Sequence, residues 1–464
     1  MERVVVKTDW TVAASAGRHV ALQDHAIVVE DGRIVDLTRD PPEDAHAIAV
    51  PGGIAVPGFI NLHNHTINAP LFRSIVDDLP RSAIGESKVY SMLMPMGGLA
   101  VTLLDAEERR AIMALGLLEV MRSGVTTLVD QFRPPQASIL DLAREWGLRL
   151  YAAPYLFSPA IGAANDAVAG ASRGSFEGES GFAEFERLFH AYDSGPEGLI
   201  RVILGPHAAD SCGPDLLRLI DSVARERHLL TTIHLAQSLG EVDRVAKQRG
   251  MDCAAYMESV GLLREGVIFA HGVHLTDDEL RRVREAGAAI ANCASVFLRG
   301  GKAPSFERFR RAGVRTGIGT DAERMDFFAQ MRATGFASKQ AYGEGDAGTA
   351  AALLRAATID AADILRRPDL GRIEKGATAD LLVIDAMKPH LQPVNDPIRS
   401  LVWYTTAADI DTVLIAGRPV IRGGRAVGID EASVIRAGAK ATRRVWDESR
   451  RRGFFALEAD PERM

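Results

Sequence analysis

The chain has 464 residues, of which 47% are hydrophobic and 25% are charged, and its formal net charge of −7 argues against a nucleic-acid-binding protein, which is usually basic. The first residues lack the apolar stretch of a signal peptide, and no run approaches the ~18 apolar residues of a transmembrane helix. The 3 cysteines show no disulfide or metal-motif spacing, so we expect a cytoplasmic protein with free thiols that binds neither nucleic acid nor membranes.

Both ends of the chain are rich in strand signals. Asp31-Gly32 between two short apolar runs predicts a β-hairpin, and strands are expected again at Leu381–Ile384 and Thr412–Ile415. We expect residues 1–56 and 376–430 to form one small β-sandwich domain built from both termini. Residues 431–464 are expected to form a helical tail, whose charged helix lies in solvent or contacts a second copy.

The middle of the chain, residues 57–375, alternates strand and helix patterns. The candidate strands are Ile54–Leu62, Val125–Val129, Leu148–Ala153, Ile200–Leu204, Leu230–Ile233, Val267–Ala270, Ala288–Ala291 and Arg315–Ile318. The helical patterns include Ala106–Arg122, Pro214–Arg227, Ser238–Arg249 and Asp277–Ala286. This alternation predicts an α/β fold, a (β/α)8 TIM barrel. A doubly wound open sheet is the alternative, but no G-x-G-x-x-G follows a strand.

Histidines mark the ends of the predicted barrel strands. His63 and His65 close the first strand, and side chains at i and i+2 of a strand point the same way, so both imidazoles can reach one ion. Further strand ends carry His207, His234, His271 and Asp321. Five of the 12 histidines thus fall where TIM barrels carry their reactive groups. The pattern predicts a metal centre.

Histidines combined with a carboxylate indicate a catalytic metal site, which keeps a position open for water. The ion lowers the pKa of that water toward ~7 and so provides hydroxide near neutral pH. Asp321 is expected both to bind the ion and to accept the proton of the water. His271 is expected to hold the hydroxide or the charge that develops on the substrate.

Longer motifs lead to a known family. They are Pro57–His65, Glu119–Thr127, Gly205–Ala208, Ile233–Ala236, His271–Leu275, Gly319–Asp321 and Gly371–Leu381. With these motifs the chain resembles, over roughly residues 25 to 425, the amidohydrolase superfamily. Within it, the chain is similar to the branch of cytosine-deaminase-like aminohydrolases and triazine chlorohydrolases.

The resemblance implies a role for each strand-end residue. His207 and His271 are expected to contact substrate or water. The fourth strand lacks the modified lysine that bridges two ions in some relatives, so one divalent transition metal is expected, Zn²⁺ in the first place and Fe²⁺ in the second. The implied metal ligands are His63, His65, His234 and Asp321.

Two positions depart from the pattern of the deaminases in this branch. Gln237 stands where they carry a glutamate that moves protons, and glutamine cannot act as a base near neutral pH. Ser295-Val296 stands where the family has Ser-Asn, so an amide that orients the substrate is missing. We expect Gln237 to contact the substrate and reaction centre, and Glu323 to bind substrate, although a charge at a helix start explains Glu323 equally well.

The expected reaction is attack of metal-bound hydroxide on an N-heterocycle, which expels ammonia or an amine. One alternative changes the leaving group to chloride, alkoxide or thiolate on a triazine-like ring, and Gln237 favours it because a good leaving group needs less protonation. A ring-opening amidase and a catalytically inactive structural homologue are further alternatives. We expect a small N-heterocyclic substrate and a homo-oligomer.

Overall fold

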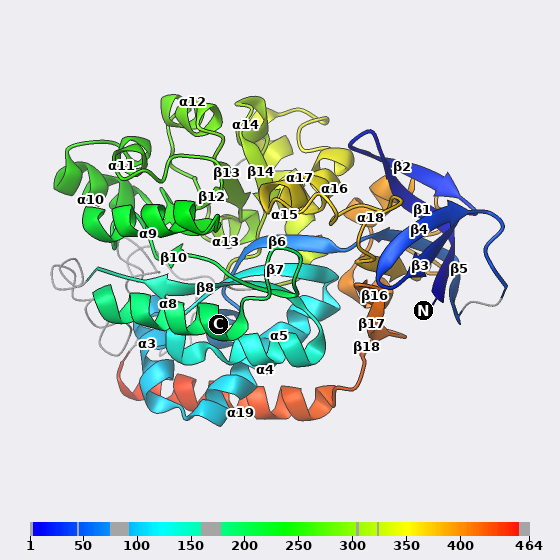
Figure 1. Ribbon diagram of the computed structural model, residues 1–464, viewed down its shortest axis with the longest axis horizontal. Helices are drawn as coiled ribbons and strands as arrows, with labels where there is room; N and C mark the ends of the chain where they lie inside the picture. Colours follow the sequence, from blue (N-terminus) through cyan, green and yellow to red (C-terminus); the bar gives the residue numbers. More distant parts are fainter. Residues whose placement is uncertain are drawn as a thin grey trace, which may run out of the picture.

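The computed structural model describes residues 3–43, 46–74, 92–158, 178–302, 306–322 and 324–453. Its larger part is a barrel of parallel strands surrounded by helices, and a β-rich part lies beside it (Figure 1). The barrel strands are β6 (Phe59–Asn64), β7 (Val125–Phe132), β8 (Arg149–Leu156), β9 (Ile200–Val202), β10 (Gly205–Pro206), β11 (Thr231–Leu235), β12 (Val267–His271), β13 (Ala289–Asn292) and β14 (Arg315–Ile318). The short strands β9 and β10 together fill the fourth strand position.

Two groups of strands close into one barrel. Strands β6 to β10 form one sheet, and β11 to β14 form another. Isolated parallel bridges join the two sheets, Leu204 with Thr231 at one seam and Asn64 with Asp321 at the other. The predicted (β/α)8 barrel is therefore confirmed. The open-sheet alternative is wrong, because an open sheet would leave two unpaired edge strands.

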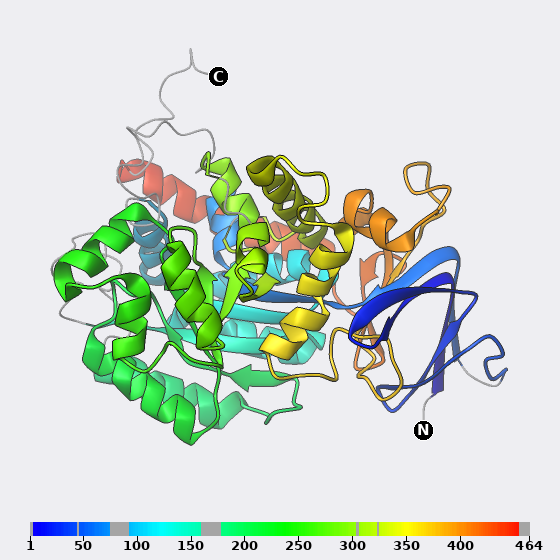
Figure 2. The ribbon, with the colours of Figure 1, turned by 90° about the horizontal axis from the view of Figure 1, so that it is seen from above.

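Helices cover the outside of the barrel in both views (Figures 1 and 2). They include α4 (Ala106–Arg122), α5 (Ser138–Trp146), α8 (Gly178–Tyr192), α9 (Pro214–Glu226), α10 (Leu239–Arg249), α11 (Cys253–Ser259), α12 (Asp277–Glu285), α13 (Ala294–Arg299), α14 (Phe306–Arg311), α15 (Phe327–Tyr342), α16 (Ala350–Ala357) and α17 (Ile359–Ile364). Local signals set their ends: the Thr276 hydroxyl and the Glu279 carboxylate form a capping box on α12. The Ser238 side chain accepts a hydrogen bond at the start of α10.

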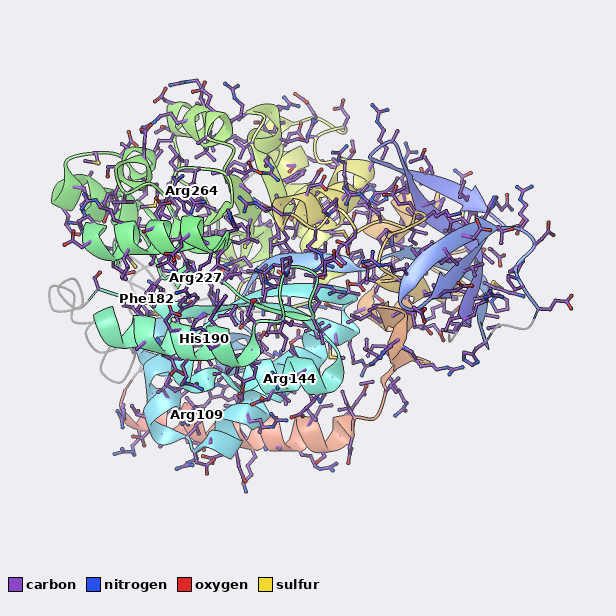
Figure 3. All side chains as sticks on the ribbon, viewed as in Figure 1. Arg109, Arg144, Phe182, His190, Arg227 and Arg264 are labelled. Carbon is purple, nitrogen blue, oxygen red and sulfur yellow. The ribbon has the colours of Figure 1, made fainter. Side chains whose placement is uncertain are left out.

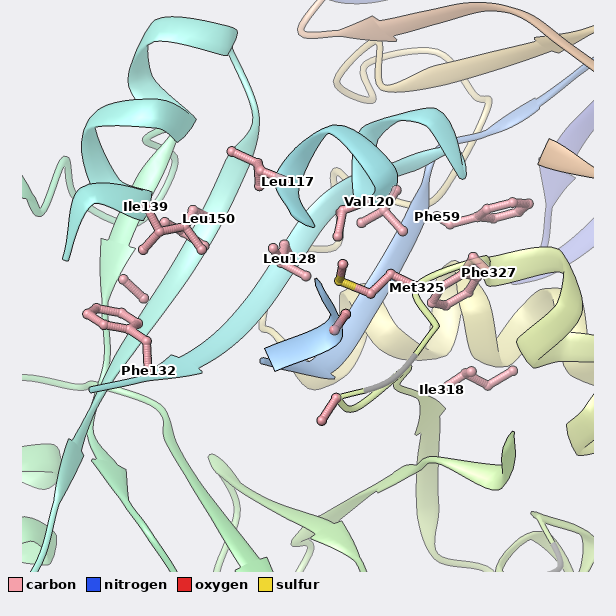
Figure 4. Close-up of a cluster of buried hydrophobic side chains, with 14 of the residues drawn as sticks. Phe59, Leu117, Val120, Leu128, Phe132, Ile139, Leu150, Ile318, Met325 and Phe327 are labelled. Carbon is pink, nitrogen blue, oxygen red and sulfur yellow. The ribbon is translucent and has the colours of Figure 1, made fainter. Parts of the chain in front are cut away.

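An apolar layer between strands and helices holds the barrel together. Figure 4 shows Leu117 and Val120 of α4 close to Leu128 of β7, and Phe59 of β6 beside Phe327 of α15. All five side chains are fully buried. Truncating one such leucine to alanine typically costs about 2–5 kcal/mol, since the lost apolar contacts leave a cavity.

The β-rich part draws strands from both termini. Its nine-stranded sheet contains β1 (Arg3–Ser15), β2 (Arg18–Gln23), β3 (Ala26–Glu30), β4 (Arg33–Thr38), β5 (His46–Pro57), β15 (Leu381–Ile384), β16 (Ile410–Ile415), β17 (Arg418–Arg422) and β18 (Arg425–Ala426). Antiparallel pairing of β5 with β15 joins the two halves. The sheet folds back on itself, because Gly32 in the β3–β4 turn lies against Ala416 in the β16–β17 turn. The expected composite β domain is confirmed, while the exact boundaries between the domains stay a prediction.

The first predicted strand, Ile54–Leu62, is in fact two strands. The chain leaves β5 at Pro57 and enters β6 at Phe59. Gly58 lies between them, where a Cβ atom would stand 2.2 Å from Thr126 Oγ1. The backbone can pass this point only because glycine has no side chain. One apolar run therefore serves the β-rich part with its first half and the barrel with its second.

The C-terminal helix α19 (Glu431–Arg451) packs on the barrel rather than lying free in solvent. Val445 is fully buried, and Trp446 Nε1 donates to the Leu71 carbonyl oxygen at 2.7 Å. Arg444 forms an ion pair with Glu108 of α4. One face of this helix is thus buried within its own chain, which corrects the expectation of a fully solvated helix, while contact with a second copy stays a prediction. Of the helices in the described ranges, none is both long and apolar enough to cross a membrane.

Candidate active site

The strand-end residues meet at the C-terminal mouth of the barrel. Closure of the barrel brings Asp321 to β6, since the N–H of Asp321 donates to the His63 carbonyl oxygen at 3.0 Å. His65 Nε2 and His63 Nε2 lie 3.5 and 4.0 Å from Asp321 Oδ1. His271 Nε2 lies 3.7 Å from Asp321 Oδ2. Residues far apart in the sequence therefore form one cluster around the Asp321 carboxylate.

His65 and His234 present the same nitrogen to the same point. The Nδ1 atom of His65 lies 2.9 Å from the Gln131 carbonyl oxygen, and Nδ1 of His234 contacts the His207 carbonyl oxygen. A carbonyl only accepts, so each Nδ1 carries the hydrogen and each Nε2 keeps a lone pair. The two Nε2 atoms lie 3.2 Å apart. Two lone pairs at this distance repel each other unless a cation lies between them.

His63 and His271 have ring nitrogens that no group of the described residues satisfies. Both ring nitrogens of His63 and Nδ1 of His271 are buried without a hydrogen-bond partner among the described residues. Unsatisfied buried polar atoms are rare because they lose their hydration without compensation. The His63, His65 and His234 donor atoms lie within 4.8 Å of one another. This donor set fits a divalent metal ion, which would satisfy one of the orphaned nitrogens of His63.

Burial keeps these imidazoles neutral, as metal ligands must be. Desolvation, followed by repulsion from neighbouring histidines, holds the pKa of His63 well below its usual range. The pKa of His65 is lowered to about 3, by burial and then by His234. Burial lowers the pKa of His234 to about 4, and the pKa of His271 is also well below normal. No protons therefore compete for these nitrogens at neutral pH.

The backbone turns sharply at three points of the site. Ala236, His271 and Asp321 have φ angles of 50°, 81° and 60°. L-residues rarely adopt this left-handed region, and each such residue costs on the order of 1–3 kcal/mol. The turns direct the side chains that follow β11, β12 and β14 into the barrel mouth. Strain at such positions is typical of functional sites, where the surrounding fold maintains it.

Two of the residues predicted to contact the substrate line a cavity at the mouth of the barrel. His207 lines the cavity, stacks on Phe157 with ring centroids 4.8 Å apart, and its Nδ1 contacts Ser211 Oγ at 2.7 Å. Gln237 also lines the cavity, and its buried Nε2 has no partner among the described residues. Glu323 lies outside the described residues. Val296 lines the cavity at the position where the family pattern has an amide.

A buried carboxylate supports the turn that carries Gln237. Glu241 is fully buried, and its two oxygens accept the backbone N–H groups of Ala236 and Gln237 at 3.1 and 2.9 Å. Desolvation, together with the nearby Asp210, raises the pKa of Glu241 to about 8. Glu241 does not line the cavity at the barrel mouth, so it orients Gln237 through the backbone. It does not replace the glutamate that the deaminases of this branch carry at position 237.

The cavity at the barrel mouth has a volume of about 370 Å³, a size suited to a small ligand. Sequence analysis missed several of its lining residues because β7 and β8 extend three residues beyond the predicted strands, to Phe132 and Leu156. The missed residues are Gln131, Arg133, Gln136, Tyr155 and Phe297. Gln131 and Tyr155 lie on these strand extensions, whereas Arg133 and Gln136 follow β7 and Phe297 lies on α13.

The three cysteines are free, as expected, and they are also buried. Cys293, which follows β13, is the one among them that lies near the site: its sulfur forms a second group of potential donors with His63 and His271. By contrast, His190 lies on the outer helix α8 (Figure 3), 3.6 Å from Glu186. His190 is therefore an ordinary surface residue.

The closed barrel and its histidine-lined mouth define a barrel enzyme with a site for a divalent metal. Residues 54–420 match the model of the amidohydrolase family, and the chain belongs to that family. It is a hydrolytic enzyme of this family, as the resemblance of its motifs predicted.

Comparison with individual proteins supports this assignment. The 5-methylthioadenosine/S-adenosylhomocysteine deaminase of Desulforudis audaxviator is 30% identical over 431 residues, which cover 90% of this chain and 94% of that relative. A zinc-bound adenosine deaminase from Xanthomonas campestris superposes with a TM-score of 0.83 at 22% identity, covering 96% of this chain and 98% of the other. The zinc complex of atrazine chlorohydrolase from Arthrobacter aurescens gives 0.83 at 22% identity, covering 95% and 100%. These two structures share the fold.

Proposed function

We propose that the chain is a metal-dependent aminohydrolase that removes ammonia or an amine from a small N-heterocycle. The observation that carries the proposal is the pair of Nε2 atoms of His65 and His234, which face each other at 3.2 Å. In a tetrahedral zinc site, two nitrogens at ~2.0–2.1 Å from the ion are about 3.3 Å apart. The deaminase from Desulforudis audaxviator, which is 30% identical, supports the choice of reaction.

The proposed ligands are His63, His65, His234 and Asp321, and they would hold one divalent ion. Imidazole and carboxylate ligands suit Zn²⁺, our first choice, and also Fe²⁺. The bound zinc of the adenosine deaminase from Xanthomonas campestris supports this order. When bound, such an ion acts as a Lewis acid that activates a water molecule as nucleophile.

The protein residues around the ion would manage protons and charge. Asp321 accepts the proton that the attacking water releases, because its carboxylate lies in the centre of the cluster. His271 Nε2, 3.7 Å from Asp321 Oδ2, is placed to hold the attacking water or the charge that develops on the ring. His207 and Gln237 contact the substrate from the cavity wall. Glu323 is a further candidate for substrate binding.

A second candidate function is displacement of a better leaving group, such as chloride or an alkoxide, from a triazine-like ring. Gln237 favours it, because an amide cannot protonate an amine as it departs. The chlorohydrolase from Arthrobacter aurescens has the same fold, which alone does not choose between the reactions. Ring-opening amide hydrolysis needs a protonated nitrogen leaving group and gains no support from Gln237. A catalytically inactive homologue is disfavoured, because the donor set is complete.

The decisive experiment combines metal analysis with a substrate screen. Purified protein should bind about one equivalent of Zn²⁺ or Fe²⁺. It should then be assayed with purines, pyrimidines, pterins and triazines that carry amino, chloro or alkoxy groups. Release of ammonia supports the proposal, and release of chloride or alcohol alone supports the second candidate. Less than half an equivalent of metal, with no activity after metal is added back, would refute both. The cytoplasmic location and the homo-oligomer stay predictions.

A further inference from the structure

Arg133 is an unusual residue in the wall of the cavity. It follows β7 directly, lines the cavity and is only 5% exposed. Its Nη2 donates to the Met94 carbonyl oxygen at 3.2 Å and contacts Met94 Sδ at 3.4 Å. Its Nη1 is buried and has no hydrogen-bond partner in the described part of the chain. A guanidinium group is therefore held inside the cavity wall with the donors of Nη1 unused by the described residues.

Among the described residues, no counter-charge faces the positive charge of Arg133. No ion pair joins it to a carboxylate of the described residues, whereas other buried arginines are paired: Arg149 lies 3.2 Å from Asp380 and Arg367 lies 2.7 Å from Asp369. An unpaired buried charge destabilises a protein, so its presence in a cavity points to an anionic ligand.

A second unsatisfied donor lies on the same turn. The N–H of Gln136 donates to the Arg133 carbonyl oxygen at 2.8 Å in the short 3-10 helix η2 (Pro134–Gln136). Side chains at i and i+3 of such a turn project to the same side. Gln136 lines the same cavity, is 2% exposed, and its Nε2 has no partner among the described residues. Arg133 and Gln136 thus offer two planar donor groups toward one wall position.

The other residues that line the cavity near Arg133 suit a flat ring as ligand. Leu93, Phe132 and Phe297 supply apolar lining to the cavity. His65 and His207, which lie near the metal site, line the same cavity as Arg133. A planar heterocycle with its reacting carbon at the metal site would therefore have its substituents within reach of this wall.

We propose that Arg133 and Gln136 bind a carboxylate group of the substrate, so that the enzyme acts on N-heterocycles that carry a carboxylate. Guanidinium and amide groups match the planar carboxylate, and hydrogen bonds between ions of opposite charge are the strong ones. This inference deepens the proposed function and rests on it. It adds a substrate class defined by charge.

The test compares ligands that differ only in the acidic group. Binding of nicotinate against nicotinamide, and of benzoate against benzamide, should be measured by calorimetry on the full chain, both metal-loaded and after chelation. The variants are Arg133→Met and Arg133→Lys, with Arg299→Met on α13 as a control for the loss of an exposed arginine. Chelated protein is included because a carboxylate can also bind a metal ion directly.

We expect the wild type and the Arg299→Met control to bind the acid at least about tenfold more tightly than the amide in both metal states. Arg133→Met should abolish this preference, and Arg133→Lys should retain part of it, since it keeps the charge but loses the planar fork. Arg133→Met should also raise the melting temperature of the ligand-free protein, because an unpaired buried charge is removed.

Equal affinities for acid and amide in the wild type, or an unchanged preference in Arg133→Met, would overturn the inference. A lower melting temperature with an unchanged preference would assign Arg133 a structural role at Met94 instead. Either result leaves the proposed function intact if the protein binds its metal and releases ammonia from a neutral heterocycle. Conversely, if the protein proved to bind no metal, the acid preference measured in chelated protein would still stand.

Discussion

The Nε2 atoms of His65 and His234 lie 3.2 Å apart, while the Nδ1 atom of each ring contacts a backbone carbonyl oxygen. These carbonyl oxygens fix the tautomer with hydrogen on Nδ1 in both rings, even without a bound ion. Such contacts orient metal-binding histidines and raise their basicity as ligands. The site is thus preorganised by the backbone of β7 and of the segment after β10. A side-chain substitution elsewhere cannot easily change the tautomers.

Replacing a proposed ligand should remove the metal. In His234→Ala, we expect bound metal to fall below about a tenth of an equivalent and activity to disappear, because a three-ligand remnant holds the ion weakly. His190→Ala, which changes a histidine 76% exposed in its side chain on α8, is the matched control. Metal analysis of both purified variants checks this expectation. Full metal content in His234→Ala would exclude His234 from the ligand set.

Metal removal should destabilise the fold. An ion that binds only the native state adds about 4 kcal/mol when its concentration is 1,000 times its Kd. Chelation should therefore lower the melting temperature by a few degrees, and added Zn²⁺ should restore it. Differential scanning calorimetry with and without chelator measures the shift. The same melting temperature in both samples would show that no ion is bound in the native state.

Acid should destabilise the metal-free protein between pH 6.5 and about 4. The pKa values of His65 and His234 are lowered to about 3 and about 4 in the folded state, whereas an unfolded histidine has a pKa of ~6.5. The unfolded chain then binds more protons, so stability is complete above pH 6.5 and falls as pH decreases, by up to about 1.4 kcal/mol per pH unit for each histidine.

Urea denaturation of chelated protein at several pH values between 4.5 and 7.5 measures this slope. The His234→Ala variant should show a shallower slope, since it loses one of the titrating groups. An identical slope in both proteins would mean that His234 is protonated in the folded state or is not buried in solution.

Gln237→Glu should introduce a group that moves protons. We expect the variant to gain activity on amino-substituted rings relative to chloro-substituted ones by about 10²-fold or more, since general acid catalysis matters most for poor leaving groups. Its pH–rate profile should acquire a new ionisation. Gln237→Met, of similar size but without the amide, serves as the control. If the Gln237→Glu profile matches that of the wild type, position 237 takes no part in proton transfer.

The ion pair between Arg149 and Asp380 should couple the barrel to the β-rich part. Arg149 on β8 donates twice to the Asp380 carboxylate, which precedes β15, at 3.2 Å each. Both side chains are almost fully buried. Arg149→Met should destabilise the protein by about 3–5 kcal/mol, because it leaves a buried carboxylate unpaired. The double variant with Asp380→Leu should recover part of this loss. Urea unfolding of the three proteins compares them.

Strand periodicity carried much of the fold prediction. Apolar runs such as Val267–Ala270 and Ala288–Ala291 match β12 and β13 to within one residue, because a buried parallel strand needs apolar residues on both faces. Helix bounds followed from caps such as Ser238 and Thr276. Polar ends of strands were harder to predict: Gln131 and Tyr155 lie on β7 and β8 but past the apolar run, so their place in the site was missed.

The sequence alone predicts which groups stand at the strand ends. Imidazoles at i and i+2 of one strand share a face, independently of the rest of the fold. Their convergence was decided only by tertiary structure. Closure of β14 on β6 sets Asp321 beside His63, and carbonyl contacts set the tautomers of His65 and His234. That no carboxylate of the described residues pairs with Arg133 likewise depends on which groups the fold brings near it. Distances between remote residues are properties of the closed barrel, and no local pattern encodes them.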